Sequence, residues 1–74
     1  MAFPAPVEHV IQFFAFDHLP EPLRTVSGEF AALALKVCHS APDDPETVVA
    51  LRKLLEAKDA AVRAVVSTRN RNSH

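Results

Sequence analysis

Residues 45–66, PETVVALRKLLEAKDAAVRAVV, decide the fold of this chain. Apolar side chains recur in this stretch at steps of three and four residues, which is the spacing of one helix face. They are Val48, Leu51, Leu55, Val62 and Val65. Asp44 precedes Pro45 and Glu46, an order typical of a helix start with Asp44 as the N-cap. The pattern predicts a helix from Pro45 to about Ser67.

A second helix is expected upstream, because a further set of apolar residues falls in one stripe. The set is Leu23, Val26, Phe30, Leu33 and Val37. Beside this stripe fall Ser27, Ala31, Ala34, Leu35 and Cys38, so the apolar arc is wide and two faces of the helix should have partners. This helix should begin near Glu21 or Pro22, and residues 39–44 form a short loop, so the two long helices are antiparallel neighbours. A shorter apolar helix from about Pro6 to Phe16 precedes them, before a break rich in proline. The sequence therefore predicts an all-α fold, with a short N-terminal helix and an antiparallel two-helix hairpin.

The length of 74 residues limits the chain to one domain with a small core. We expect one helical hairpin domain over residues 1–67 and a disordered, polar tail over residues 68–74. The lone Cys38 excludes an intrachain disulfide, and the histidines lack the spacing of metal ligands, so no metal site is expected. Because the predicted helices carry more apolar surface than one copy can cover, the domain is expected to form a homo-oligomer.

Composition narrows the class of function. The formal net charge is -1, which gives the chain no basic footprint for DNA. No apolar run reaches the roughly 20 residues that span a bilayer, and no signal peptide is recognisable, so we expect no membrane partner and a location in the reducing cytoplasm. Metalloprotease, phosphate-loop and nucleophile-elbow motifs are absent. We therefore expect a protein that is not an enzyme and uses no cofactor.

Lys58 interrupts the apolar stripe of the last helix. Its ammonium either reaches past the apolar surface to water, pairs with a carboxylate, or serves an anionic ligand at an interface, and the sequence leaves these alternatives open. The neighbouring charges favour ion pairs across one turn, of Arg52 with Glu56 and of Asp59 with Arg63, on a solvated face.

Aromatic side chains stand just before the helix break, at Phe14 and Phe16, close to His18. A ring in such a place is most often part of the core, yet it also suits stacking on a nucleobase. His18 is able to donate to a phosphate or to satisfy a helix end. Gly28 costs the second helix about 1 kcal/mol relative to alanine. It indicates close approach by a ligand or a partner backbone, or else a tolerated surface glycine.

Two segments, FDHLPEPLRTVSGEFAALAL and PETVVALRKLLEAKDAAVRAVV, resemble a known family. These are the small phage proteins that sponge cyclic oligonucleotide signals to block CBASS immunity, often called anti-CBASS type two proteins. The resemblance covers about Phe14 to Val66, and the motifs HLP, S-x-x-F-x-x-LA and ALRKLLEAKDAAVRA carry it. A relative of the same hairpin domain sponges the Thoeris signal, a cyclic ADP-ribose isomer.

The resemblance implies a phage protein that acts in the host cytoplasm as a homohexamer. Its pockets between protomers would bind cyclic dinucleotides such as cGAMP, and in many members cyclic trinucleotides at separate sites, without cleaving them. In that family an aromatic residue stacks on a base and basic side chains hold phosphates. The expected ligand-binding residues are Phe16, His18, Leu19, Pro20, Arg24, Ser27, Lys58 and Arg63.

One departure from the family leaves the preferred messenger open. Where some relatives have a basic residue early in the second helix, this chain has Ser27, Gly28, Phe30 and Ala31, with Arg24 as the nearby cation. The main hypothesis is a sponge for cyclic oligonucleotide messengers. The alternatives are a self-associating helical protein-interaction module without a small ligand, and a sponge for a cyclic ADP-ribose isomer.

Overall fold

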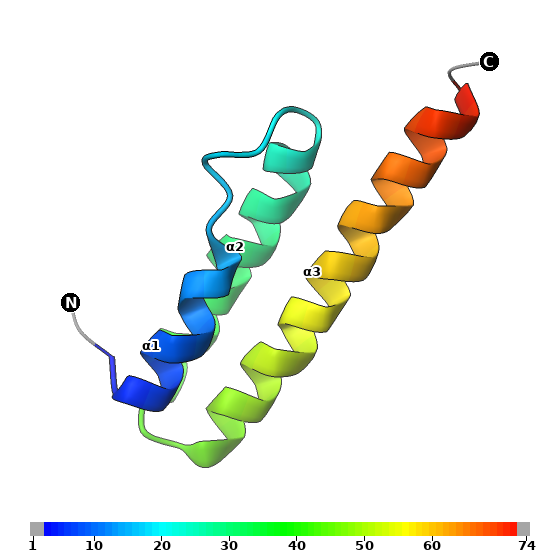
Figure 1. Ribbon diagram of the computed structural model, residues 1–74. Coiled ribbons are helices and arrows are strands. Elements are labelled where there is room, and N and C mark those ends of the chain that lie inside the picture. The colour runs from blue at the N-terminus through cyan, green and yellow to red at the C-terminus, as the bar shows by residue number, and fades with distance from the viewer. Residues whose placement is uncertain (1–2, 73–74) are drawn as a thin grey trace.

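The computed structural model describes residues 3–72, and this part of the chain is built from helices alone. The order is α1 (Ala5–Ile11), the 3-10 helix η1 (Gln12–Phe14), α2 (Leu23–Ser40) and α3 (Pro45–Asn72). Figure 1 shows α2 and α3 running antiparallel and joined by a short loop, with α1 beside them. The all-α prediction, a short N-terminal helix plus an antiparallel hairpin, is confirmed.

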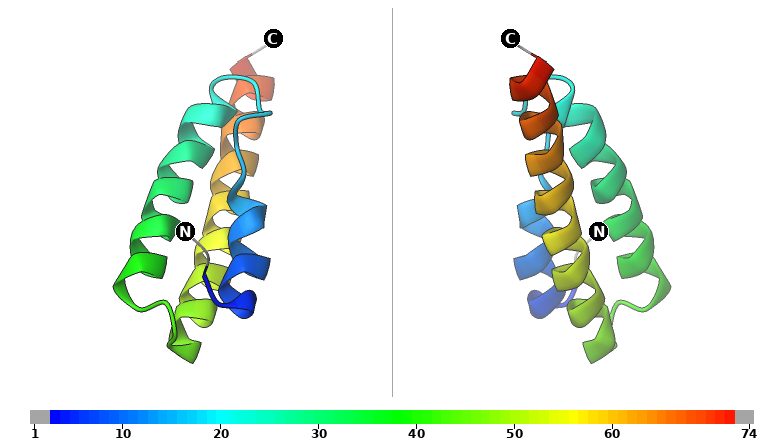
Figure 2. Two further views of the ribbon diagram at one scale, coloured as in Figure 1. Left: turned by 90° about the vertical axis from the view of Figure 1, so that its left-hand side faces the viewer. Right: turned by 90° about the vertical axis from the view of Figure 1, so that its right-hand side faces the viewer.

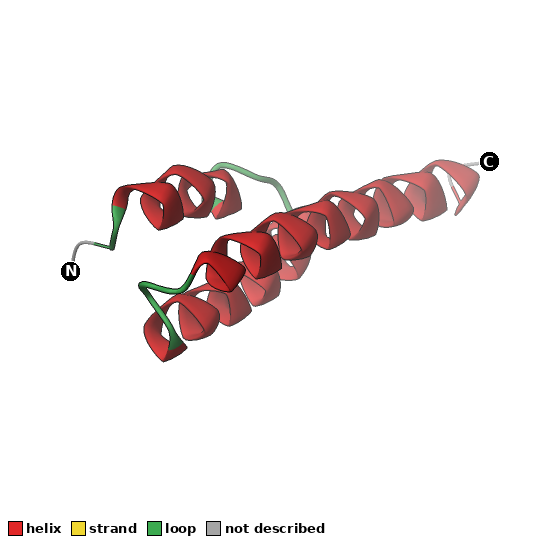
Figure 3. Ribbon diagram, turned by 90° about the horizontal axis from the view of Figure 1, so that it is seen from below, coloured by secondary structure: helices red, strands yellow, loops and turns green. Residues whose placement is uncertain are grey.

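The long helix α3 sets the shape of the molecule. Its 28 residues span about 42 Å at 1.5 Å per residue, close to the longest dimension of 48 Å. Because α2 has 18 residues, α3 runs on past it, as Figures 2 and 3 show. Within residues 3–72, no helix combines the length and the apolar character that crossing a bilayer requires.

The start of α3 follows the prediction. The Asp44 carboxylate accepts a hydrogen bond from the backbone amide of Glu46 at 2.8 Å, and the Asp44 carbonyl accepts one from the amide of Thr47 at 3.0 Å. The buried Thr47 hydroxyl donates to the carbonyl of Ala41. These bonds satisfy amides that have no partner inside the helix, and they fix the loop against the first turn of α3.

The first helix ends earlier than the sequence suggests. The predicted helix runs to Phe16, but α1 stops at Ile11, tightens into η1 and ends at Phe14, after which Ala15 is extended with φ -57° and ψ 135°. The carbonyl of Phe13 accepts a hydrogen bond from Lys58 Nζ at 3.2 Å. Phe16 therefore lies in the connector to α2 and not in a helix.

The core of α2 lies on a different stripe from the one predicted. The expected side chains of Val26, Phe30 and Val37 are half-buried, and Leu33 is 49% exposed. The buried face consists of smaller residues, namely Ser27, Ala31, Ala34 and Cys38. Small side chains let α1 and η1 come close to α2, so that bulky residues of the N-terminal segment and α3 fill the space. Those buried residues are Val7, Val10, Phe14 and Leu51.

The structure differs from the expected disordered tail at the C-terminal end of α3. Residues 68–72 continue α3, while residues 73 and 74 lie outside the described range. The Arg71 guanidinium donates to the Thr68 hydroxyl at 3.4 Å, and the cations Arg69 and Arg71 stand at the negative end of the helix dipole. Propagation of a helix that is already formed adds one hydrogen bond per residue, so an exposed extension is able to persist without packing.

The Glu21 carboxylate stabilises the start of α2. It accepts hydrogen bonds from the Thr25 hydroxyl at 2.6 Å and the Thr25 amide at 3.0 Å, and it pairs with Arg24 at 3.4 Å. The Thr25 hydroxyl, then the Thr25 amide and then Arg24 hold the pKa of Glu21 below its ordinary value. Glu21 therefore contributes stability above the pKa of the unfolded chain, and this stability is lost as the pH falls through the lowered pKa of the folded chain.

We expect Glu21→Gln to lower the thermal midpoint at neutral pH and to have no effect once the carboxyl group is protonated. Circular dichroism melts of wild type and variant across the acidic range would measure the difference. Thr25→Val, which removes the hydroxyl donor, should shrink the pH-dependent difference. A difference in thermal midpoint that stays constant across the carboxyl titration would contradict this account of the helix start.

Candidate functional site

A pocket of 320 Å³ lies between the α1–α2 connector, α2 and α3. We call it the cationic pocket, and it is lined by Phe13, Ala15, His18, Leu19, Ser27, Lys58, Asp59, Val62 and Arg63. Its lining contains the cations Lys58 and Arg63 and one carboxylate, Asp59, so these three side chains together give the pocket a positive charge. This local charge contrasts with the net charge of -1 for the whole chain. Positive side chains therefore gather in this pocket although the chain as a whole is nearly neutral.

Lys58 is both a structural and a pocket residue. Its side chain is 13% exposed, and Nζ lies 3.2 Å from the Phe13 carbonyl and 3.2 Å from Asp59 Oδ1. An ammonium has three protons, so these two partners leave one proton for a group in the pocket. Of the alternatives that the sequence leaves open, the structure contains the carboxylate pair, and it adds a backbone carbonyl that the sequence pattern does not show.

Ser27 lies on α2 at the floor of the cationic pocket. The residue is fully buried, and within the described chain its hydroxyl has no hydrogen-bond partner. A serine inside a helix often donates to the carbonyl four residues earlier, but Ser27 does not. Leaving a buried hydroxyl unsatisfied costs about 1–3 kcal/mol. The pocket thus has at its floor a polar group whose capacity to donate and accept is unused.

Arg63 is exposed, and its guanidinium takes no part in an ion pair of the described residues. The expected Asp59–Arg63 pair does not form, because Asp59 instead contacts Lys58, the next residue along the helix. The expected pair of Arg52 with Glu56 does not form either. A guanidinium that is not held by a carboxylate keeps its planar fork available for a phosphate or carboxylate.

A second hollow, of 430 Å³, lies along the first half of α2. We call it the Phe16 groove, and it is lined by Phe16, Glu21, Arg24, Thr25, Gly28, Glu29 and Ala32. Phe16 is half-buried and presents part of its ring to the groove. Arg24 stands at the same groove but is engaged with Glu21 at 3.4 Å. The groove therefore combines an aromatic surface with a cation that a carboxylate already neutralises.

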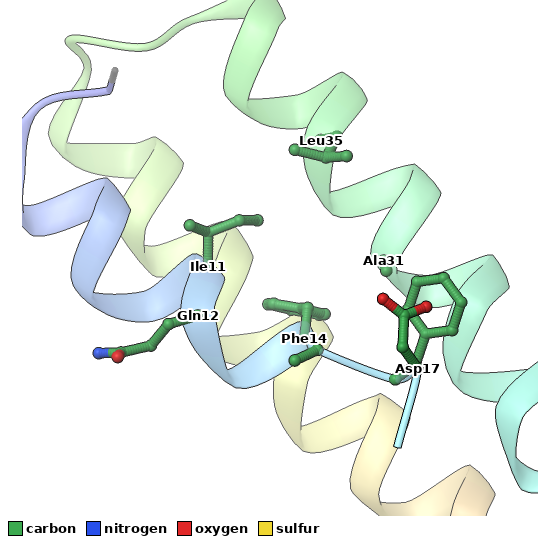
Figure 4. Close-up of a pocket in the computed structure, with 8 residues that line it drawn as sticks. Ile11, Gln12, Phe14, Asp17, Ala31 and Leu35 are labelled. Atoms are coloured by element: carbon green, nitrogen blue, oxygen red, sulfur yellow. The ribbon is translucent and has the colours of Figure 1, made fainter. Parts of the chain in front are cut away.

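An apolar pocket of 220 Å³ lies on the other side of the connector, between α1–η1 and α2. In Figure 4 Ile11 and Phe14 extend from the N-terminal segment while Ala31 and Leu35 belong to α2, and Asp17 stands at the end nearest Ala31. Phe16 lines this pocket as well as the Phe16 groove. Phe16 thus belongs to the linings of two hollows.

The structure sorts the residues expected from the family resemblance into separate places. The cationic pocket holds His18, Leu19, Ser27, Lys58 and Arg63, whereas the Phe16 groove holds Phe16 and Arg24. Pro20 is exposed and lines neither hollow.

Sequence reasoning did not select Phe13 and Asp59, which also line the cationic pocket. The contact of Asp59 with Lys58 joins adjacent residues, so no helical periodicity signals it. The exposed ring of Phe13 was indistinguishable by spacing from its buried neighbour Phe14.

Two further observations concern the thiol of the chain and its potential metal ligands. Burial raises the pKa of the Cys38 thiol, which lies in the core and away from both hollows. Within the part of the chain that the structure describes, no three histidine, cysteine, aspartate or glutamate side chains gather closely enough to hold a metal ion.

Comparison of the chain with protein-family models, with curated proteins and with solved structures finds no match. The functional assignment therefore depends on the residues and geometry of the chain itself, together with the resemblance of its motifs.

Proposed function

We propose that this chain is a phage anti-defence protein that binds cyclic oligonucleotide second messengers and sequesters them without cleaving them, which blocks CBASS-type immunity in the host cytoplasm. The observation that carries the proposal is the cationic pocket. It joins Lys58 and Arg63 of α3 to His18 of the connector over the unsatisfied hydroxyl of Ser27. Cyclic dinucleotides such as cGAMP are the expected ligands, and cyclic trinucleotides are further candidates.

The chemistry of a cyclic dinucleotide suits the cationic pocket and the Phe16 groove. Such a molecule presents negative phosphates and flat bases, which require charged donors and an aromatic surface respectively. Lys58 and Arg63 supply charged donors, and Phe16 supplies the ring. A phosphate would reside in the cationic pocket while a base stacks on the ring in the Phe16 groove.

The arrangement of the pocket supports binding without reaction. The Ser27 hydroxyl forms no hydrogen bond with the His18 ring or with any other group of the described chain. A serine nucleophile needs an adjacent base within hydrogen-bond reach to lose its proton. A sequestering protein requires only slow release, which a charged pocket and a stacking ring provide without a reacting group.

The same proposal includes assembly into a homo-oligomer, with a hexamer expected from the family resemblance. Large apolar side chains remain exposed on one copy, namely Phe13, Leu33, Leu35, Val49 and Val66, at 39–52%. Small-ligand sites usually enclose about 300–1,000 Å³ and bury most of the ligand. The cationic pocket has a volume of 320 Å³, at the lower end of this range, so a neighbouring copy would add to the enclosure of a ligand.

Isothermal titration against cyclic GMP-AMP, cyclic di-nucleotides, cyclic tri-adenylate and a cyclic ADP-ribose isomer tests the proposal. We expect saturable binding of at least one cyclic dinucleotide, by a species that sedimentation velocity shows to be larger than one chain. No heat with any cyclic oligonucleotide would contradict the proposed function. A stable monomer at micromolar concentration would contradict the proposed assembly.

A self-associating helical interaction module is the second candidate. The observation that favours it is an apolar hollow of 520 Å³ on the α2–α3 surface, whose lining includes Leu33, Val37 and Ala50 but no residue of α1. Such a surface suits an amphipathic helix of another chain. Oligomers that bind none of the nucleotides in the titration would favour this candidate over the sponge.

A sponge for a cyclic ADP-ribose isomer would use the same kind of binding site for a different ligand. That ligand also combines phosphates with a base, so the cationic pocket and the Phe16 ring would serve it equally. Binding of this isomer with no response to cyclic dinucleotides would select this alternative.

A further inference from the structure

The single glycine of the chain lies directly under the ring of Phe16. A Cβ placed on Gly28 would be 3.1 Å from Phe16 Cε2, 3.3 Å from Cδ2 and 3.5 Å from Cζ. These three atoms are consecutive, so one edge of the ring rests on the Gly28 backbone. The close approach that a helical glycine indicates is therefore made by a side chain of the same chain.

The backbone on both sides of Phe16 is held by hydrogen bonds. Lys58 holds the carbonyl of Phe13 at 3.2 Å, and the amide of Leu19 donates to the Phe16 carbonyl at 3.0 Å. The half-buried side chain of Phe16 packs against the core and also lines both the Phe16 groove and the apolar pocket. On the side of α2, the surface that limits how closely the ring approaches is the backbone of Gly28.

We propose that Gly28 is a positioning residue, which sets the depth and tilt of the Phe16 ring so that its face is available to a nucleobase in the Phe16 groove. This inference rests on the proposed function. Glycine is among the least favourable residues inside a helix. Any other residue would place a Cβ at 3.1 Å from the ring and push the ring outward, so the local cost in helix stability is offset by the close packing of the ring edge on α2.

The test is Gly28→Ala, titrated with cyclic GMP-AMP and melted without ligand. We expect affinity to fall about tenfold, because stacking on a displaced ring is weaker and base stacking contributes of the order of five- to a hundredfold in affinity. The thermal midpoint should stay equal or rise, because alanine favours the helix and the ring has room to yield. Wild-type affinity in Gly28→Ala, or a clear fall in its thermal midpoint, would overturn the inference.

A double-mutant cycle with Phe16→Ala shows whether the ring transmits the effect. Without the ring, Gly28→Ala should no longer change affinity, so the two substitutions should be non-additive. Independent, additive losses would overturn the positioning role while leaving the sponge intact. A wild-type protein that binds no cyclic oligonucleotide would instead overturn the proposed function, and this inference with it.

The ring contact also has a readout that needs no ligand. In the wild type, the Hα resonances of Gly28 should be displaced by the ring current of Phe16. They should return to ordinary helical values in Phe16→Ala. Unchanged Hα resonances in that variant would overturn the inference, because the ring would then not rest on Gly28.

Discussion

Phe14→Ala is expected to lower the free energy of unfolding by about 3–5 kcal/mol, the usual cost of removing a large buried aromatic side chain. Phe14 is 2% exposed and lies in the core beside Val7, Val10 and Leu51. Small domains have a total stability of only about 5 kcal/mol or somewhat more. The variant should therefore be largely unfolded at room temperature, which far-ultraviolet circular dichroism and urea titration would measure.

The adjacent Phe13 provides a matched control for this prediction. It has the same side chain on the same 3-10 helix, but it is 52% exposed. Its ring makes an edge contact with the His9 ring, at 5.7 Å between centroids. Phe13→Ala should leave the helical content intact and cost about 1 kcal/mol or less, as surface substitutions do. Similar losses in both variants would contradict the assignment of Phe14, and not Phe13, to the core.

Arg63→Ala is expected to weaken the binding of cyclic GMP-AMP by about ten- to a hundredfold. A hydrogen bond to a charged group contributes about 1.5–3 kcal/mol. Arg63 lines the cationic pocket and has no ion pair among the described residues, so its guanidinium is free to serve a phosphate. The loss should grow smaller at high salt, because the exposed charge is screened. Titration calorimetry at low and high salt would measure both effects.

Arg52→Ala is the matched control for the charge. Arg52 also lies exposed on α3, so its removal changes the net charge by the same amount, but it does not line the cationic pocket. Its loss should leave affinity nearly unchanged, and neither variant should lose helical content. Equal weakening by the two substitutions would indicate attraction by the overall charge, and would contradict the pocket.

The fold could be predicted where local rules decide it. Asp44, Pro45 and Glu46 mark the start of α3 through backbone hydrogen bonds within a few residues, and the structure contains those bonds. The end of the first helix could not be predicted in this way. At this end the Phe13 carbonyl accepts a hydrogen bond from Lys58, 45 positions away, and no local pattern indicates such a contact.

Hydrophobic periodicity predicted a wide apolar arc on α2 that contains the buried residues, but it placed the larger side chains at the centre of that arc. The largest apolar residues predicted a stripe through Leu33, but the buried positions are Ser27, Ala31, Ala34 and Cys38. In a close-packed core, the size of each side chain is limited by the space that its neighbours leave. The bulky ring of Phe14 fills much of the core, so small side chains of α2 pack beside it. A sequence pattern that ranks residues by hydrophobicity alone cannot register this exchange of large and small side chains.

The candidate site was predicted as a set of residues but not as an arrangement. The resemblance to the sponge family selected both His18 and Phe16, while the structure places one in the cationic pocket and the other in the Phe16 groove. Neither the unsatisfied hydroxyl of Ser27 nor the contact between Gly28 and Phe16 could be read from sequence, because both depend on tertiary packing.

The most direct test of the account is recovery of a messenger after capture. Cyclic GMP-AMP is incubated with excess protein, the unbound fraction is separated by filtration, and the retained fraction is heat-denatured and analysed by mass spectrometry. The account predicts that the messenger disappears from the filtrate and reappears after denaturation, intact and in full. A messenger that stays in the filtrate, or that returns as a linear or otherwise cleaved product, would contradict it.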